Sequence, residues 1–198
     1  VPEEFQCAGK YKARSLEFVR RVRTDEGYAG WVYFIDEENW VTGQTVKAIT
    51  HFAAYGNAKF ASGPLGFNNG GSHLAWLGDS LRRAEARISH LEHHFGWWPV
   101  HGDNMLLNFE VEKEIGWEFK ELTEDVQFSG HVLRKGYRTG WHGGELQTMS
   151  PTSLADFIKQ RRRWFRGMLQ CIFSKGVGVR FKLIQAYFLL SGIIMAFI

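Results

Sequence analysis

The stretch from residue 122 to residue 167 guides the interpretation of this chain; it reads LTEDVQFSGHVLRKGYRTGWHGGELQTMSPTSLADFIKQRRRWFRG. Glu124 and Asp125 begin a predicted helix, and the helix macrodipole favours acidic side chains in that first turn. Further on, three arginines stand between Gln160 and Trp164 on a second predicted helix. This ordered pair predicts a carboxylate base and a cationic floor for a phosphorylated ligand.

The second helix, predicted from Leu154, is amphipathic. Ser153 and Asp156 form a capping box at its start, where Pro151 suits the first turn. Its apolar stripe comprises Leu154, Phe157, Ile158, Phe165, Met168, Leu169 and Ile172. Its polar edge comprises Gln160, Arg163 and Trp164. We therefore expect an interfacial helix that rests on a membrane or a hydrophobic floor and offers this polar edge to a site.

Upstream, helices alternate with an apolar strand. The run 31–35 (WVYFI) is continuous and apolar, which predicts a strand buried on both faces, as in a parallel sheet. Helices are predicted at 9–23 and 42–55, the second with Thr42 as its cap. The residues expected to face inward are Ala13, Leu16, Val19 and Val22 in the first helix and Val46, Ile49 and Ala53 in the second. Helices around a buried strand indicate an α/β fold.

Acidic residues follow that strand at the end where α/β sheets bind ligands. Asp36 and Glu38 flank Glu37, and two carboxylates at this spacing can share a divalent cation with a diphosphate. An ordinary solvent-exposed acidic loop is the alternative interpretation. His90, His93 and His94 lack further ligands at metal-binding spacing, so we interpret them as surface residues.

The middle of the chain predicts further elements of the same fold. A strand over 60–67 is interrupted by Gly63-Pro64, and a short strand begins at Met105. Between them, one amphipathic helix has its apolar positions at Leu74, Leu77, Leu81, Ala84, Ile88, Leu91 and Phe95.

Composition indicates a globular protein: 44% of the 198 residues are hydrophobic and 23% are charged, which excludes a disordered chain. Aromatic residues reach 15%, with eight Trp, which suits a carbohydrate-handling or membrane-proximal protein as well as an aromatic core. Two distant cysteines, Cys7 and Cys171, predict neither a disulfide framework nor a metal site.

The last segment, 181–198, is almost entirely apolar after Lys182, and we expect it to be the start of a transmembrane helix. Arg180 and Lys182 would keep the preceding domain on the cytosolic side. A buried C-terminal helix of a soluble domain is the alternative. Because the sequence starts at Val1 and stops in an apolar run, we expect a fragment of a longer, multi-pass membrane protein.

These motifs, in this order, resemble the membrane-integrated inverting family-2 glycosyltransferases, which include cellulose, chitin and hyaluronan synthases. The matching segments are Lys12-Ala13-Arg14-Ser15-Leu16, Asp36-Glu37-Glu38, Thr123-Glu124-Asp125 and Gln160 through Trp164. The flanking residues Lys10-Tyr11 and Ser150-Pro151 are similar to the Egghead-type β-1,4-mannosyltransferase branch.

The resemblance implies a partial GT-A (Rossmann-like) catalytic domain over 1–150, an interfacial amphipathic helix over 151–176 and a truncated transmembrane helix over 181–198. It implies that Asp125, beside Glu124, is the base, and that Asp36 and Glu38 hold Mg²⁺ or Mn²⁺. It also implies a site for the donor diphosphate, formed by Lys12, Gln160, Arg163 and Trp164. The acceptor would lie against Gly102, Asp103 and Trp164.

The implied reaction is inverting transfer of a hexose from GDP-mannose or a UDP-sugar to a glycan or glycolipid hydroxyl, which forms a β-linkage. The expected partners are therefore this donor, this acceptor and membrane lipid, with no nucleic acid. A catalytically inactive, membrane-tethered binding module is the alternative, because the basic and aromatic helix also suits lipid or polyanion contact. An RNA-binding domain is the weakest reading, since no stacking platform accompanies the arginines.

Three residues or regions depart from the family pattern. Glu38 is one methylene longer than the usual second aspartate of the acidic motif, and Thr148 replaces an acid found two residues before Ser-Pro in many relatives. The strand that recognises the nucleotide base has no counterpart in the sequence. We therefore expect the donor to bind properly only to a longer protein.

Overall fold

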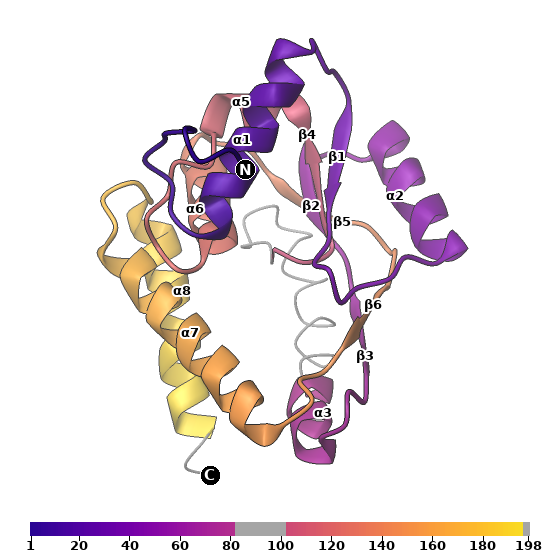
Figure 1. Ribbon diagram of the computed structural model, residues 1–198, viewed down its shortest axis with the longest axis vertical. Helices are drawn as coiled ribbons and strands as arrows, with labels where there is room; N and C mark the ends of the chain where they lie inside the picture. The colour runs from indigo at the N-terminus through magenta and orange to yellow at the C-terminus, as the bar shows by residue number, and fades with distance from the viewer. Residues whose placement is uncertain (82–101, 196–198) are drawn as a thin grey trace. The chain divides into compact units, whose positions relative to one another are not determined.

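The computed structural model describes residues 1–81 and 102–195 (Figure 1). The chain divides into two compact units. Unit 1 comprises residues 1–30, 109–136 and 162–198, and unit 2 comprises residues 31–108 and 137–161. Each unit joins segments that are distant in sequence. The division falls within one long helix, between Arg161 and Arg162.

Unit 2 contains all the strands of the described chain. They are, in chain order, β1 (Trp31–Phe34), β2 (Phe60–Ser62), β3 (Leu65–Asn68), β4 (Met105–Asn108), β5 (Thr139–Trp141) and β6 (Leu146–Met149). One sheet has the order β1-β4-β2-β5, in which β4 is antiparallel to both neighbours and β2 is parallel to β5. The strands β3 and β6 form a separate parallel pair. The helices of this unit are α2 (Gly43–Tyr55), α3 (His73–Ser80) and the beginning of α7 (Leu154–Phe173).

The predicted strand at 31–35 is present as β1, but the prediction that it is buried on both faces is wrong. All four of its residues are half-buried. Its position at the end of the sheet order explains this, since β4 is its sheet neighbour among the described strands and runs antiparallel to it. The broken strand at 60–67 is confirmed as β2 and β3, which stop and restart at Gly63-Pro64.

Helix α2 begins at its predicted cap but buries a different side chain. The Thr42 hydroxyl accepts a hydrogen bond from the Thr45 backbone N–H at 3.1 Å, and a capping box is complete. Val46, predicted to face inward, is 49% exposed, whereas Thr45 is fully buried. The Thr45 hydroxyl donates to the Glu145 carbonyl, so a polar contact and not an apolar stripe fixes this turn of the helix.

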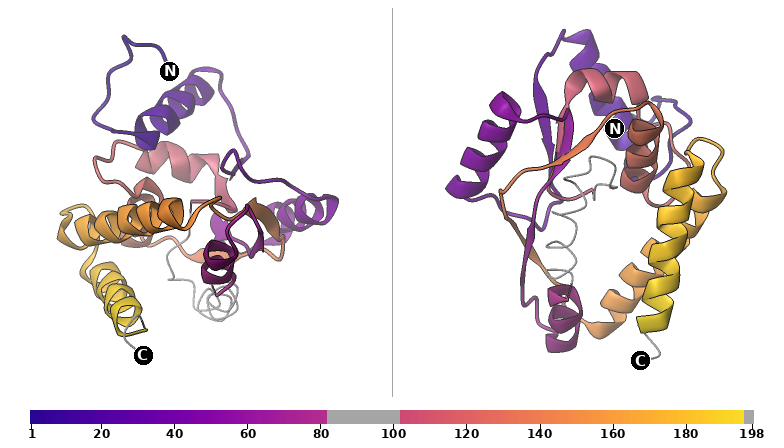
Figure 2. Two further views of the ribbon diagram at one scale, coloured as in Figure 1. Left: turned by 60° about the horizontal axis from the view of Figure 1, so that its bottom comes forward. Right: turned by 180° about the vertical axis from the view of Figure 1, so that it is seen from behind.

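The regular secondary structure of the described part of unit 1 is entirely helical. It contains α1 (Lys12–Asp25), α5 (Phe109–Ile115), α6 (Glu124–Arg134), the later part of α7 and α8 (Val179–Met195). At its centre, the Trp117 ring stacks on Phe128 with centroids 4.2 Å apart. A second cluster joins α7 and α8 through Cys171, Val177 and Phe181. Figure 2 shows α7 and α8 leaving their connecting loop in different directions.

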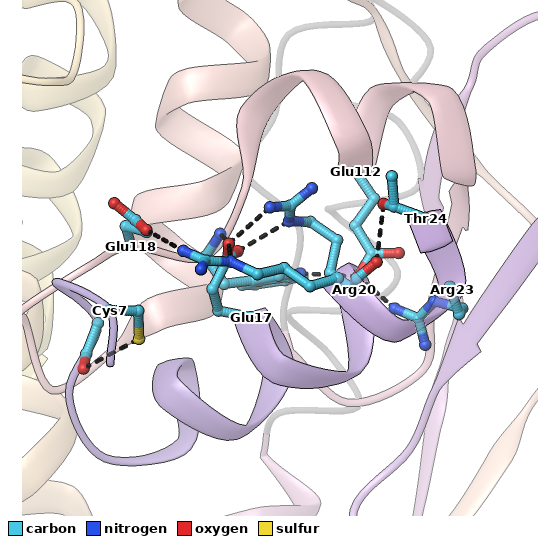
Figure 3. Close-up of polar contacts among 10 residues, drawn as sticks. Cys7, Glu17, Arg20, Arg23, Thr24, Glu112 and Glu118 are labelled. Carbon is cyan, nitrogen blue, oxygen red and sulfur yellow. Dashed lines mark hydrogen bonds and ion pairs between the residues drawn. The ribbon is translucent and has the colours of Figure 1, made fainter. Parts of the chain in front are cut away.

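The face that α1 buries differs from the prediction. Ala13 is fully buried as expected, but Val19 and Val22 are 43% and 36% exposed. Glu17 is 1% exposed in their place. Its carboxylate accepts hydrogen bonds from Arg20, from Arg21 and from the backbone N–H of Trp117, so an ionic contact replaces the expected apolar one (Figure 3).

A second buried carboxylate completes this ionic network between α1 and α5. Glu112 is fully buried and accepts from Arg23 at 2.5 Å and from the Trp117 indole N–H at 2.8 Å (Figure 3). An open cavity of about 390 Å³ lies beside the network. Its charged lining residues are Glu17, Arg20, Arg21, Asp25, Lys113 and Glu118.

The predicted amphipathic helix from Leu74 begins as α3, and the described residues of its predicted apolar stripe are exposed. Leu74, Leu77 and Leu81 have 63%, 55% and 67% of their surface accessible. The remaining positions of that stripe, and His90, His93 and His94, lie outside the described residues. Within 1–81 and 102–195, no helix is long and apolar enough to cross a membrane, so the transmembrane interpretation of 181–198 stays a prediction.

Candidate functional site

The carboxyl ends of β1, β2 and β5 meet at one end of the sheet in unit 2. The register pairs Phe34 with Met105, Met105 with Ser62, and Ser62 with Trp141, so three strand ends and the start of β4 are aligned. Ligands of open α/β sheets bind at such an edge. We refer to it as the carboxyl edge.

The acidic motif follows β1 directly at this edge. Asp36 is half-buried and its carbonyl accepts from the Asn39 backbone N–H at 3.1 Å, which closes a turn around Glu37 and Glu38. Glu38 is exposed. Both polar atoms of the Asn39 amide are buried without a hydrogen-bond partner among the described residues. Three carboxylates and an amide therefore lie in one short turn after β1.

The predicted acceptor loop reaches the same edge from β4. Gly102 and Asp103 are half-buried and immediately precede Asn104, which is fully buried and has a φ of 59°. The Tyr33 hydroxyl donates to the Asn104 amide oxygen at 2.6 Å. Burial, assisted by the charge of Asp103, raises the pKa of Tyr33 above its usual value. The structure thus brings Asp103 and the strand that leads to Asp36 together.

A buried histidine lies beside Asn104 at the carboxyl edge. His142 follows β5, is 1% exposed, and one ring nitrogen lies 3.3 Å from the Asn104 carbonyl. Its other ring nitrogen has no hydrogen-bond partner among the described residues. Burial lowers the pKa of His142 to about 4, so the ring is neutral at physiological pH.

The second group of predicted residues lies in unit 1, at the start of α6. Glu124 and Asp125 occupy its first turn, as predicted, and Thr123 is its N-cap residue. The Thr123 side chain makes no capping hydrogen bond; its hydroxyl lies 3.5 Å from the Cys171 sulfur on α7. Burial raises the pKa of Cys171 to about 12, so this thiol is protonated and inert.

Two further contacts hold the start of α6 against α7. The Leu122 backbone N–H donates to the Gln170 side chain at 3.1 Å. A side chain at Gly167 would collide with Thr123, so the helices approach closely because this position has no Cβ. Arg163 and Trp164 are about one helical turn before Gly167 on the same helix. Asp125 and this pair of residues therefore belong to one packed unit.

Residues of the basic cluster from Gln160 to Trp164 differ in their surroundings. Arg161 bonds to Asp79, which is 3% exposed, and its guanidinium lies 4.5 Å from the Phe157 ring centroid, so it anchors α7 to α3 within unit 2. Arg163 is exposed in unit 1, and Trp164 is half-buried there. Gln160 is half-buried in unit 2, and its amide oxygen has no partner among the described residues.

Lys12, predicted to lie near the diphosphate, is the exposed first residue of α1 in unit 1. Tyr11 precedes it with a φ of 55°, a backbone region that side-chain-bearing residues seldom adopt. The predicted residues are thus divided between the units: Lys12, Glu124, Asp125, Arg163 and Trp164 in unit 1, and Asp36, Glu38, Gly102, Asp103 and Gln160 in unit 2.

The acidic turn after β1 has the oxygen donors that hard divalent cations take. Asp36 and Glu38 supply two carboxylates, and the unpartnered amide of Asn39 adds polar atoms beside them. No group of three or more His, Cys, Asp or Glu residues that could hold a metal occurs in the described ranges. These residues suit Mg²⁺ or Mn²⁺ when a ligand such as a diphosphate supplies further oxygens.

Sequence reasoning missed the residues that hold these groups in place. Tyr33 is predicted only as part of the strand at 31–35, and neither Asn104 nor His142 is singled out. Their one sequence signal is a polar side chain beside an apolar strand, which is too common to be selective. The pair Gly167 and Cys171 gave a better signal, since small residues four apart on a helix indicate close packing.

Comparison with known proteins identifies the family of this chain. Residues 31–198 match the family described as "Glycosyl transferase family group 2". The chain is 28% identical over 203 residues to "Beta-1,4-mannosyltransferase bre-3" of Caenorhabditis briggsae, which covers 94% of this chain and 44% of that protein. It is 25% identical over 207 residues to "Beta-1,4-mannosyltransferase egh" of Drosophila melanogaster, with coverage of 98% and 45%.

The chain spans less than half the length of these curated relatives. The family match, in contrast, extends from the first residue of β1 to the end of the chain and includes the carboxyl edge, the start of α6 and all of α7. The mixed α/β fold and the resemblance inferred from the motifs are therefore confirmed, and the chain belongs to glycosyl transferase family group 2.

Proposed function

We propose that this chain is part of a membrane-bound, inverting glycosyltransferase that transfers a hexose from a nucleotide-sugar to a glycan or glycolipid hydroxyl. The observation that carries the proposal is the packing of the α6 start against α7. It keeps the acidic pair Glu124-Asp125 and the pair Arg163-Trp164 in one unit of a chain that belongs to a glycosyltransferase family.

In the proposed reaction, Asp125 removes the proton from the acceptor hydroxyl as its oxygen attacks the anomeric carbon. The start of α6 favours a negative side chain there, and Glu124 adds a second acid. Arg163 and Lys12 neutralise charge on the leaving diphosphate, while Gln160 and Trp164 line the donor site. A single displacement inverts the anomeric centre, so an α-linked donor gives a β-linkage.

Asp36 and Glu38 would hold Mg²⁺ or Mn²⁺ on the donor diphosphate, and the ion would neutralise charge on the departing group. Gly102 and Asp103 would line the acceptor side of the carboxyl edge, and Trp164 is also proposed to bind the acceptor. GDP-mannose is the first donor to test because the names of the relatives specify mannosyl transfer. UDP-glucose and UDP-N-acetylglucosamine are the next.

We assign residues 1–150 to the later part of a GT-A catalytic domain, 151–176 to an interfacial helix and 181–198 to the start of a transmembrane helix. The exposed apolar side chains of α7 support the second assignment. Leu154, Ile158, Phe165, Leu169 and Phe173 are between 40% and 76% exposed. Such a stripe suits the lipid surface, with the catalytic domain on the cytosolic face and further spans in the full-length protein.

The test uses the full-length protein in membranes, assayed for sugar transfer from each donor with Mn²⁺ or with chelator. Asp125→Asn should lower transfer by about 10²-fold to 10⁴-fold, the usual contribution of a general base. Asp25→Asn is the matched control, because Asp25 is an exposed residue at the end of α1. Equal transfer by wild type and Asp125→Asn would remove Asp125 from the base role.

A catalytically inactive, membrane-tethered binding module is the second candidate, and the same exposed apolar side chains of α7 favour it. It predicts that wild type binds anionic vesicles but transfers no sugar from any donor. Replacing Leu169 with Glu, on this stripe, should weaken vesicle binding in either case. The transfer assay therefore separates the two functions, and the vesicle assay tests the α7 surface that they share.

A further inference from the structure

We propose that Tyr33 and Asn104 are positioning residues that fix the Gly102–Asp103 loop at the carboxyl edge and so determine how tightly the sugar acceptor binds. This inference rests on the proposed function, because it assigns the acceptor side of that site. It is carried by a buried hydrogen-bond hub, defined here as Tyr33, Asn104 and His142.

Asn104 uses every part of its amide to join segments that are separate in sequence. Its amide oxygen accepts from Tyr33 on β1 at 2.6 Å. Its amide nitrogen donates to the Pro64 carbonyl at 2.7 Å and to the Gly144 carbonyl at 2.9 Å. One fully buried side chain thus connects the end of β1, the turn after β2 and the loop after β5.

The backbone conformation of Asn104 determines how the Gly102–Asp103 loop joins β4. Its φ of 59° lies in the left-handed region, which Asn enters more readily than other side-chain-bearing residues. This conformation turns the chain between Asp103 and the first residue of β4. The loop therefore leaves the strand at a fixed angle, and the amide contacts hold that angle.

Apolar and aromatic groups pack around the hub. The Tyr33 ring packs against the cluster of Leu65, Phe67 and Leu146. His142 lies edge-on to Tyr33 with ring centroids 6.2 Å apart. A side chain at Gly63 would collide with both the His142 ring and the Asn104 amide. The chain therefore passes close to the hub directly after β2.

The hub acts on the acceptor side through Asp103. Asp103 directly precedes Asn104, whose amide oxygen accepts from the Tyr33 hydroxyl, and the charge of Asp103 helps burial to raise the pKa of Tyr33. Tyr33 is three residues before Asp36 on the same strand end. The hub thus sets the position of Asp103 relative to the acidic motif after β1.

The test compares Tyr33→Phe and Asn104→Gly with wild type in the full-length protein. Tyr33→Phe removes one hydroxyl, and Asn104→Gly retains the backbone freedom while it removes the amide. We expect the acceptor KM to rise about threefold to tenfold for Tyr33→Phe, as one lost hydrogen bond implies, and at least about tenfold for Asn104→Gly. The donor KM should change by less than about twofold, because the donor-side residues are untouched.

Matched controls carry the same chemical change on the surface of unit 2. Tyr55→Phe alters a residue that is 79% exposed, and Asn57→Gly alters an exposed loop residue. Both should leave the two KM values unchanged. If the hub only stabilised the fold, its variants would lower the amount of folded enzyme and leave both KM values at wild-type level. That result would overturn the proposal.

A second measurement decides the proposal without catalysis. Hydrogen exchange, followed by mass spectrometry on the ligand-free protein, should be faster in Tyr33→Phe and Asn104→Gly for peptides spanning 102–108 and 143–146. Peptides of α6 should be unaffected. Unchanged exchange at 102–108 would overturn the inference even in an active enzyme. Absence of transfer by wild type would instead refute the proposed function, and the exchange data would still test the positioning role.

Discussion

Two networks bury polar side chains in different ways: the network between α1 and α5 in unit 1 uses charges, and the hub of Tyr33, Asn104 and His142 in unit 2 does not. Unit 1 buries two carboxylates, Glu17 and Glu112, and pairs them with arginines of α1. Unit 2 buries Asn104 and His142, whose polar contacts are neutral. A charged network costs more to desolvate and more to break, so the two networks should respond differently to mutation, acid and salt.

The largest effect should come from removing a buried carboxylate of unit 1 and leaving its partners unpaired. Glu112→Ala removes the partner of Arg23 and of the Trp117 indole, and we expect a loss of about 3 to 5 kcal/mol in the free energy of unfolding. Urea unfolding followed by circular dichroism measures it. Glu110→Ala, whose exposed side chain pairs with Lys113 on the same helix, should cost less than about 0.5 kcal/mol.

The comparison would break if Tyr33→Phe, which removes a neutral hydrogen bond from unit 2, cost as much as Glu112→Ala. We expect about 1 kcal/mol for that hydroxyl. A matching cost for both variants would mean that burial alone, and not charge, sets the stability of these networks.

Acid should affect His142 of unit 2 at a higher pH than Glu17 of unit 1. Burial lowers the pKa of His142 to about 4, so the stability gained by keeping it neutral is complete above pH 6.5 and is lost as the pH falls towards 4. This loss amounts to about 3 kcal/mol. Urea unfolding at pH 7, 5.5 and 4.5 measures it, and the slope over this range should be smaller in His142→Gln.

For Glu17 the corresponding loss of stability occurs at a lower pH. Burial alone would raise its pKa, but hydrogen bonds from Arg20, Arg21 and the Trp117 backbone lower it to about 2. Its contribution is therefore complete above pH 4.5 and is lost between pH 4.5 and 2. A wild-type slope between pH 7 and 5 that His142→Gln leaves unchanged would assign that titration to another group.

An intermediate effect should come from the contact that uses neither charge nor a strong hydrogen bond. Gly167→Ala would push its new methyl group into Thr123 and should destabilise the chain by about 2 kcal/mol, as overpacking does. Gly178→Ala, also in unit 1, meets open space and should change stability by less than about 0.5 kcal/mol. Thermal unfolding of the two variants measures the difference.

The double variant Thr123→Ser with Gly167→Ala sharpens this experiment, because serine lacks the methyl group that the alanine meets. It should recover part of the lost stability. Failure to recover any would show that the helices separate for another reason, and the packing of the α6 start against α7 would need a different explanation.

The smallest effect should come from the exposed rim of the charged network. Glu118→Gln breaks its ion pair with Arg21, in which both side chains are more than 40% exposed. We expect a change below about 0.5 kcal/mol, and 0.5 M NaCl should remove most of it by screening. A loss as large as that of Glu112→Ala would show that exposure does not divide this network into strong and weak pairs.

The sequence predicted correctly where these helices begin, but it did not predict which of their faces are buried. The helices at Thr42 and Ser153 begin where their caps predict, since a cap is a contact between residues three apart. The faces of α1 and α2 were predicted from apolar periodicity, and there Glu17 and Thr45 occupy buried positions. Their partners, Trp117 and Glu145, are about 100 residues away in sequence, so periodicity gives no sign of them.

The candidate site divides in the same way. Sequence alone determined the order of the motifs, the position of Glu124-Asp125 at a helix start and membership of a glycosyltransferase family, because these depend on local spacing and residue type. Only the tertiary structure revealed that Thr123 contacts Cys171 and that Tyr33, Asn104 and His142 form a hub. Such contacts join distant segments, and their geometry exists only once the strands and helices have packed.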